Sequence, residues 1–256
     1  MTAPFTEHPG PAATGIRDVE VWSIPLLQPP EVIAALLDDL DTEERRRAAR
    51  NPRYGVAHGA VRRILAARAG CAAAELRRTA GPNGKPGLAG PGADLGWNLS
   101  ASGDWALLAL LPTAPGPGVS PSRPDTPVAV GVDVQILVPT EAALGLARRY
   151  FPAAEARQVE SPGADARADS SPGAVYTRLW AYKEAYVKVF GGQLMQGLGV
   201  TVPAGPSGTM DGPLGRCRVA AVPGPAPDYR AAVAVTGESR PRPCPRTWAY
   251  EPAAAG

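Results

Sequence analysis

Three charged side chains in the second half of the chain have the types and spacing to handle a phosphorylated ligand. Glu184 and Lys188 lie four residues apart in WAYKEAYVKVF, so a helix would present both on one side, in the favourable order of acid before base. Asp133 ends the apolar run VAVGVD. Carboxylates suit Mg²⁺, which takes one or two of them and completes its shell with water and substrate phosphates. An ammonium would contact the phosphates themselves.

Lysine is rare in this chain, which makes its positions informative. Of the 26 basic residues, only Lys85, Lys183 and Lys188 are lysines. Two of them flank Glu184, and the third lies alone in GKP. A chain that otherwise uses arginine is expected to place lysine where a compact ammonium serves better than a planar guanidinium.

Each of these features also has a plain structural explanation. Asp133 could be a solvated residue at the end of a strand, and for the pattern alone this explanation is the commoner one. Glu184 and Lys188 could be a surface pair that contributes about 0.3–0.5 kcal/mol. The helix is apolar around most of its circumference, however, and buried charges need partners. A cation and a phosphate would supply them.

The elements that position these side chains follow from periodicity. Alternation in a strand over 128–134 puts four valines on one face and Ala129, Gly131, Asp133 and Gln135 on the other. The small residues predict that something bulky packs over this second face. A helix is expected over 176–190.

The first half shows a similar mixture of elements. Strand 19–24, helix 30–40, a helix beginning at Asp41 or Thr42, a break at Asn51-Pro52 and a helix over 53–69 are expected. The sequence therefore predicts an α+β protein. We expect a disordered segment 1–15, an N-terminal α+β subdomain 16–127 that ends in a Pro-rich linker, and a C-terminal α+β subdomain 128–250. The latter contains a mobile loop at about 159–173.

Composition excludes several classes of protein. The 256 residues carry a net charge of +2, and no segment looks like a signal peptide or a membrane span. The three cysteines have no metal-type spacing, so a cytoplasmic location is expected. Between Glu43 and Arg68 there are eight arginines and two acids, a basic block that could attract phosphates, an acidic protein or nucleic acid. P-loop, GxGxxG and GxSxG motifs are missing.

Four strings in this order resemble the Sfp-type 4′-phosphopantetheinyl transferases: GKP, NLSASG, GVDV and WAYKEAYVK. In that family they read GKP, N-[LIV]-S-H-S, G-[IV]-D-x-E and W-x-x-K-E-[AS]-x-x-K, and the last two are the specific ones. The resemblance spans about 45–189. It implies transfer of the phosphopantetheine arm of coenzyme A to a serine of an acyl or peptidyl carrier protein, with release of 3′,5′-ADP. It also implies a pseudo-dimer of two similar α+β subdomains with the active site between them.

The resemblance assigns roles to individual residues. Asp133, Gln135 and Glu184 would bind Mg²⁺, with Asp133, Glu184 and Lys188 as the catalytic residues. Glu184 would also act as general base for the carrier serine, and Lys188 would stabilise the leaving phosphate. Coenzyme A would be contacted by Arg47, Arg53, Lys85, Pro86, Ser100, Ala101, Lys183 and Lys188.

Two positions depart from the family pattern. Gln135 replaces a second acid, and Ala101 replaces a histidine that helps to bind the 3′-phosphate. His58 or Arg62 could take over that contact. These departures keep open a weakened coenzyme A or carrier-binding module. Another enzyme that uses coenzyme A, such as an acyltransferase, would not need the pair Asp133 and Glu184.

The expected partners follow from the same resemblance. They are coenzyme A and, transiently, the carrier proteins of fatty-acid, polyketide and nonribosomal-peptide synthesis, as in secondary metabolism. We expect a monomer that does not bind membranes. Nucleic-acid binding is not expected either, because the basic block lacks interleaved aromatic residues.

Overall fold

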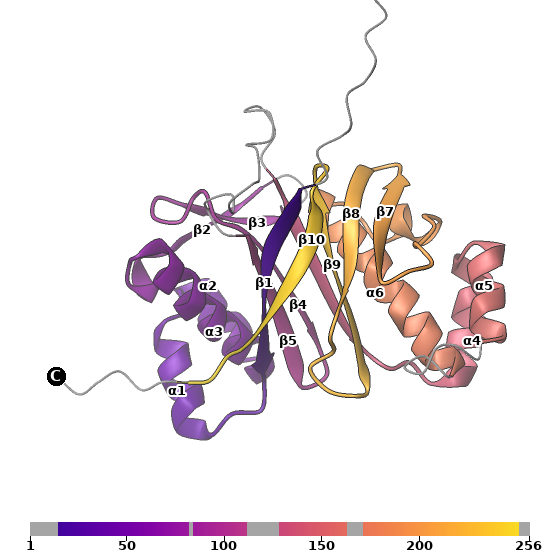
Figure 1. Ribbon diagram of the computed structural model, residues 1–256. Coiled ribbons are helices and arrows are strands. Elements are labelled where there is room, and N and C mark those ends of the chain that lie inside the picture. The colour runs from indigo at the N-terminus through magenta and orange to yellow at the C-terminus, as the bar shows by residue number, and fades with distance from the viewer. Residues whose placement is uncertain (1–14, 82–83, 112–127, 163–170, 251–256) are drawn as a thin grey trace, which may run out of the picture.

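The computed structural model describes residues 15–81, 84–111, 128–162 and 171–250, and the mixed α+β architecture predicted from the sequence is confirmed (Figure 1). The expected disordered N-terminus, the Pro-rich linker and the centre of the expected mobile loop lie outside these residues. The first half contains β1 (Ile16–Pro25), α1 (Pro30–Asp38), α2 (Thr42–Ala48), α3 (Pro52–Ala69), a short 3₁₀ turn (Ala73–Glu75), β2 (Arg77–Ala80), β3 (Pro86–Ala89), β4 (Gly96–Ser102) and β5 (Trp105–Leu111). The second half contains β6 (Val130–Ile136), α4 (Thr140–Tyr150), α5 (Ala153–Glu160), α6 (Pro172–Phe190), α7 (Met195–Leu198), β7 (Ser207–Gly212), β8 (Gly215–Val222), β9 (Tyr229–Thr236) and β10 (Arg240–Thr247).

Local capping signals set the helix boundaries. Asp41 forms a capping box with Glu44 at the start of α2: the Glu44 N–H donates to Asp41 Oδ1 at 2.8 Å, and the Asp41 N–H donates to Glu44 Oε2 at 3.2 Å. Asn51 caps α3 with Pro52 in its first turn, so the predicted break is confirmed. Helix α6 begins at Pro172, four residues earlier than predicted, because the Ser171 hydroxyl accepts from the Ala174 N–H.

The two halves share an order of three strands, β1-β5-β4 in the first half and β6-β9-β8 in the second. The first sheet runs β10-β1-β5-β4 and the second β6-β9-β8-β7. In each half the opening strand pairs antiparallel with the closing strand, β1 with β5 and β6 with β9. A long helix, α3 or α6, lies between them in the chain. This repeat is the arrangement that a pseudo-dimer of similar subdomains requires.

Strand β10 was not predicted, and it crosses the expected boundary between the subdomains. It pairs parallel with β1, so the C-terminal end of the chain completes the sheet of the first half. Prolines occupy every second position at 241, 243 and 245. Only one side of the strand therefore lacks N–H donors, which an edge strand tolerates because one of its sides is unpaired.

The sheets meet in the middle of the molecule and the helices lie outside them. Figure 1 shows α1–α3 on one side and α4–α6 on the other, with the strands between. An apolar layer fills the space between the two sheets; its buried members include Val19, Val21, Leu107, Ala109, Val132, Val134, Val233 and Val235. Burying this layer fixes the two halves relative to each other.

A ladder of polar side chains joins the edge strands β4 and β6, and we call this contact between the two sheets the joint. Alternate residues of β4 each accept a hydrogen bond from a backbone N–H of β6. The pairs are Asn98 Oδ1 with Val132 N at 2.9 Å, Ser100 Oγ with Val134 N at 3.4 Å, and Ser102 Oγ with Ile136 N at 3.1 Å. These side chains satisfy a sheet edge that would otherwise be exposed, so the NLSAS string has a structural role in addition to any catalytic one.

Helix α6 crosses β6 at Gly131, on the face predicted to be covered. A Cβ there would lie 2.4 Å from Ala185 O and 2.5 Å from Val189 N, both backbone atoms. We expect Gly131→Ala to lower the free energy of unfolding by about 1–3 kcal/mol, because neither backbone can move aside cheaply. Urea denaturation measures the change.

Gly145 provides the matched control for this prediction. It lies inside α4, and a Cβ there would meet nothing within 4 Å. Gly145→Ala should leave stability unchanged or raise it by up to about 1 kcal/mol. Equal stability of the two variants would contradict the close crossing.

Candidate active site

Asp133 lies at the joint with its side chain buried. Its Oδ1 accepts hydrogen bonds from Lys188 Nζ at 2.6 Å and from the Ser100 hydroxyl at 2.8 Å, and Lys188 also donates to Ser100 Oγ at 2.9 Å. Asp133 Oδ2 is buried and has no hydrogen-bond partner among the described residues. Burial raises the pKa of Asp133, while the Lys188 ammonium acts in the opposite direction.

Glu184 lies one helical turn before Lys188 on α6 and is half-buried. Among the hydrogen bonds and ion pairs within the described ranges, none involves its carboxylate. Burial raises the pKa of Glu184; the Lys188 charge lowers it and the Asp133 carboxylate raises it. The structure therefore brings together the three charged residues that the sequence predicted, and the two acids interact electrostatically.

These oxygen atoms fit a divalent cation. The unpartnered Asp133 Oδ2 and the free Glu184 carboxylate are hard ligands of the kind that Mg²⁺ takes. Gln135 is partly buried and lies two residues after Asp133 on the same strand face, where it can add a neutral amide oxygen. No group of three His, Cys, Asp or Glu side chains suited to a metal occurs in the part of the chain that the structure describes. Water and ligand phosphates would thus have to complete the shell.

Lys183 was predicted to face the ligand, and the structure places it elsewhere. It is 0% exposed, and its Nζ lies 2.7 Å from Glu155 Oε2, 2.5 Å from Val200 O and 4.9 Å from the Phe151 ring centre. Burial lowers the pKa of Lys183, and Glu155 counteracts this. We therefore leave Lys183 out of the ligand contacts. Glu155, which the sequence analysis did not single out, is its partner from α5.

Lys85 makes its contacts with the protein backbone. Its Nζ donates to Val189 O at 2.6 Å and to Val130 O at 3.3 Å. Pro86, the other residue expected from GKP, begins β3 opposite Ala80.

A hollow of about 370 Å³ lies between the start of α3 and the end of β4. Arg53, Ala101, Tyr54 and His58 line it. The Arg53 guanidinium pairs with Asp104 at 2.5 Å, on a half-exposed surface. Arg47 lies on α2, paired with Glu43 at 3.0 Å, and does not line the hollow. The structure thus gathers Arg53 and Ala101, and leaves Arg47 outside.

His58 and Arg62 have different surroundings. The His58 ring stacks on Tyr54 with centroids 3.9 Å apart, and its Nδ1 lies 2.7 Å from Arg78 Nη1. Burial and the Arg78 charge lower the pKa of His58 to about 4, so the imidazole is neutral at pH 7. Arg62 is buried and its Nε donates to Glu44 Oε2 at 2.6 Å. Of the two candidates to replace the missing histidine, only His58 lines the hollow.

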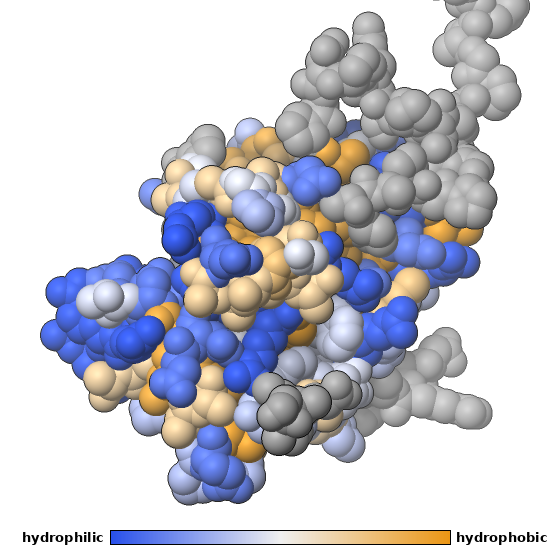
Figure 2. Space-filling view, turned by 90° about the vertical axis from the view of Figure 1, so that its left-hand side faces the viewer, coloured by the Kyte–Doolittle hydropathy of each residue, from blue (hydrophilic) through white to orange (hydrophobic). Residues whose placement is uncertain are grey.

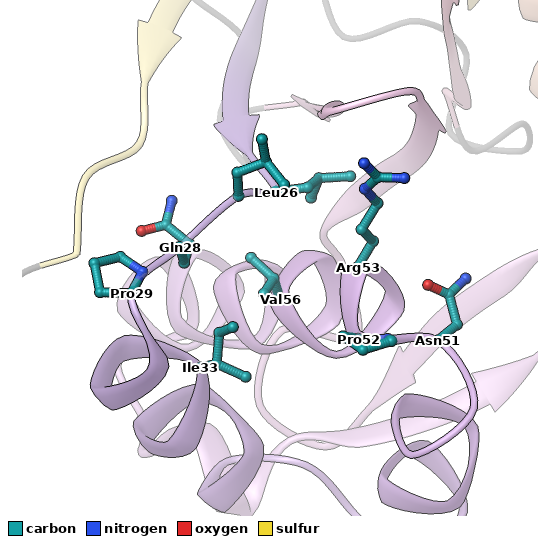
Figure 3. A pocket seen from close by; sticks show the side chains of 9 residues that line it. Leu26, Gln28, Pro29, Ile33, Asn51, Pro52, Arg53 and Val56 are labelled. Carbon is teal, nitrogen blue, oxygen red and sulfur yellow. The ribbon is translucent and has the colours of Figure 1, made fainter.

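A second, more apolar hollow of about 620 Å³ adjoins the first. Leu26, Asn51 and Arg53 line both hollows. Figure 3 shows Arg53 and Asn51 at one end and Pro29 and Ile33 at the other. Arg53 is therefore a charged residue at the boundary between a polar and an apolar cavity.

The outer face of the first half is mixed in character. Figure 2, which looks at the molecule from the side of α1–α3, shows hydrophilic side chains interspersed with apolar ones. The arginines of α2 are divided among local partners, including the Glu43 carboxylate and the carbonyl of Leu40. Within the described ranges, no helix has the length and apolarity needed to cross a bilayer.

The fold and the site together define an α+β enzyme whose two halves enclose a pair of carboxylates and an ammonium, a set suited to phosphoryl chemistry. The family model of the 4′-phosphopantetheinyl transferase superfamily matches residues 129–210, which include all three charged residues. The protein slr0495 of Synechocystis sp., provisionally named a 4′-phosphopantetheinyl transferase, is 29% identical over 191 residues, 72% of this chain and 69% of that protein. The 4′-phosphopantetheinyl transferase HetI of Nostoc sp. is 29% identical over 182 residues, 68% of this chain and 69% of HetI. Over these segments the chain is similar to 4′-phosphopantetheinyl transferases, and the similarity includes the region that carries Asp133, Glu184 and Lys188.

Proposed function

We propose that this enzyme transfers the 4′-phosphopantetheine arm of coenzyme A to a serine of an apo carrier protein and requires Mg²⁺. One observation carries the proposal: Asp133 holds the Lys188 ammonium with Oδ1, its Oδ2 has no partner among the described residues, and the Glu184 carboxylate interacts electrostatically with both residues. Such a set binds a metal and a diphosphate together.

The residues of the site have separate tasks in this reaction. The serine hydroxyl of the carrier attacks the phosphorus that bears the pantetheine arm, and the P–O bond to 3′,5′-ADP breaks. Glu184 accepts the serine proton, a role that a raised pKa suits. Lys188 stabilises the leaving phosphate, and Ser100 orients the Lys188 ammonium through a 2.9 Å hydrogen bond.

Asp133 and Glu184, with Gln135 as a neutral ligand or a partner of bound water, would hold the Mg²⁺. When bound, the ion neutralises diphosphate charge that builds up in the transition state. Since Gln135 contributes no charge, the phosphates are expected to supply a large share of the coordination.

The hollow beside Ala101 is the proposed position of the nucleotide end. Arg53 would exchange its Asp104 partner for a phosphate, and the neutral His58 would donate a hydrogen bond. Arg78, next to His58, adds positive charge behind it. Lys85, Pro86, Lys183 and Arg47 are not part of this proposed contact set.

We propose that the enzyme acts as a cytoplasmic monomer on acyl and peptidyl carriers, including those of polyketide and nonribosomal-peptide synthesis. A second candidate function, a coenzyme A or carrier-binding module with a weakened site, is favoured by Gln135 and Ala101 alone.

Intact mass spectrometry of an apo acyl carrier protein tests the proposal. Incubation with the enzyme, coenzyme A and Mg²⁺ should add one phosphopantetheine arm, and EDTA should prevent the addition. If the masses of several carrier proteins stay unchanged while this protein still binds coenzyme A, the binding module is favoured instead. Transfer that survives EDTA would contradict the metal requirement.

A further inference from the structure

The partly buried ammonium of Lys85 reaches from one half of the molecule to the other. It belongs to the turn before β3, and both of its acceptors, Val130 O and Val189 O, belong to the second half. Burial lowers the pKa of Lys85 to about 8, and none of the described ion pairs includes it. Partial burial removes water from the ammonium, and its two hydrogen bonds to carbonyls offset this loss.

The first contact continues the ladder of the joint. Side chains of Asn98, Ser100 and Ser102 serve backbone groups of β6 at positions 132, 134 and 136. The next position of this series is Gly96 opposite Val130, and glycine has no side chain to offer. At this position Lys85 makes a contact of the opposite direction: its ammonium donates to the carbonyl of Val130, which points to the same edge as those N–H groups.

The second contact satisfies the end of the catalytic helix. The last carbonyls of a helix have no N–H donor within the helix, and they carry the negative end of the helix dipole. The Gly191 and Gly192 N–H groups bond to Lys188 O and Val187 O, and the Lys85 ammonium bonds to Val189 O. The turn that Lys85 caps is therefore the turn that carries Lys188.

These contacts converge where α6 touches β6. Gly131, next to Val130, lies against the backbone of Val189, and Lys85 bridges the carbonyls of these two valines. We infer that Lys85 is a positioning residue: it clamps the last turn of α6 onto β6 and so keeps Lys188 over Asp133. The kinetic consequence rests on the proposed function, whereas the clamp itself does not.

Hydrogen–deuterium exchange of the full chain tests the clamp without any substrate. Lys85→Met keeps the length of the side chain and removes the ammonium. Amides of residues 187–192 should exchange at least about 10-fold faster, as expected for the loss of a buried bond to a charged group. Arg77→Met is the control, because Arg77 lies exposed in the same hairpin and its side-chain hydrogen bond within the described ranges goes to Ala74 O of its own half. Unchanged exchange in Lys85→Met would overturn the inference.

Ligand measurements separate a clamp from a ligand contact. Calorimetric titration with 3′,5′-ADP should give dissociation constants within about 2-fold for the wild type and Lys85→Met, while kcat falls about 10-fold or more because Lys188 is misplaced. A 10-fold weaker 3′,5′-ADP affinity with unchanged kcat would show that Lys85 touches the nucleotide and overturn the inference. If Lys85→Met does not fold, Lys85→Gln, which can still donate to one carbonyl, takes its place in both measurements. An inactive wild type would contradict the proposed function and leave the exchange test intact.

Discussion

Glu184→Gln is expected to lower kcat for carrier modification by about 10²- to 10⁴-fold, the usual effect of losing a general base. The substitution preserves the shape of the side chain but removes both its negative charge and its capacity to accept a proton. Glu184 is half-buried without a partner among the described residues, so the fold does not depend on its charge. We expect the thermal midpoint to stay within a few degrees of the wild type.

The Mg²⁺ dependence of the variant distinguishes the two roles of Glu184. If the residue acts mainly as a metal ligand, raising the Mg²⁺ concentration should restore much of the rate. If it acts mainly as a base, the loss should persist at saturating Mg²⁺ and shrink at high pH. Glu141→Gln, at an exposed position of α4, is the matched control and should retain full activity. Full activity of Glu184→Gln would contradict the proposed site.

Local chemistry made part of this fold predictable. The helix start at Asp41, the break at Asn51-Pro52 and the alternation of β6 are all set within a few residues of the chain, and they appear as expected. The small residues on one face of β6 correctly predicted a close neighbour, and that neighbour is α6 at Gly131. The gathering of Asp133, Glu184 and Lys188 also followed from family motifs.

Other features depend on contacts between distant parts of the chain. Strand β10 contains three prolines, which by themselves argue against a strand, and only its edge position beside β1 makes them acceptable. The rarity of lysine correctly marked special sites, but it did not reveal their partners. Lys188 meets Asp133, whereas Lys85 and Lys183 meet carbonyls and a carboxylate inside the protein. Residue type predicted a compact ammonium at all three positions and the family resemblance predicted a shared ligand for them, but the contacts within the protein depend on the topology.

Removing one partner of the buried pair Lys183–Glu155 should cost more stability than breaking any exposed ion pair of the described structure. Lys183→Met leaves the Glu155 carboxylate in the core with one remaining donor, the Val202 N–H at 2.7 Å. We expect a loss of about 3–5 kcal/mol in the free energy of unfolding, because an uncompensated charge stays buried. Urea denaturation measures this loss, and kcat per folded molecule should change far less than in Glu184→Gln.

A double-mutant cycle separates the charge from the packing. Glu155→Gln keeps an oxygen for the Val202 N–H and removes the charge, so it strands the Lys183 ammonium instead. In the variant that carries both substitutions no charge remains buried, and its stability should exceed that expected from adding the two single losses. The Arg148–Glu160 pair, at 2.7 Å on the surface, is the control, and Arg148→Met should cost less than about 1 kcal/mol. A Lys183→Met variant as stable as Arg148→Met but with a weakened coenzyme A affinity would instead return Lys183 to the ligand site, because only an ammonium that faces the cleft could produce that combination.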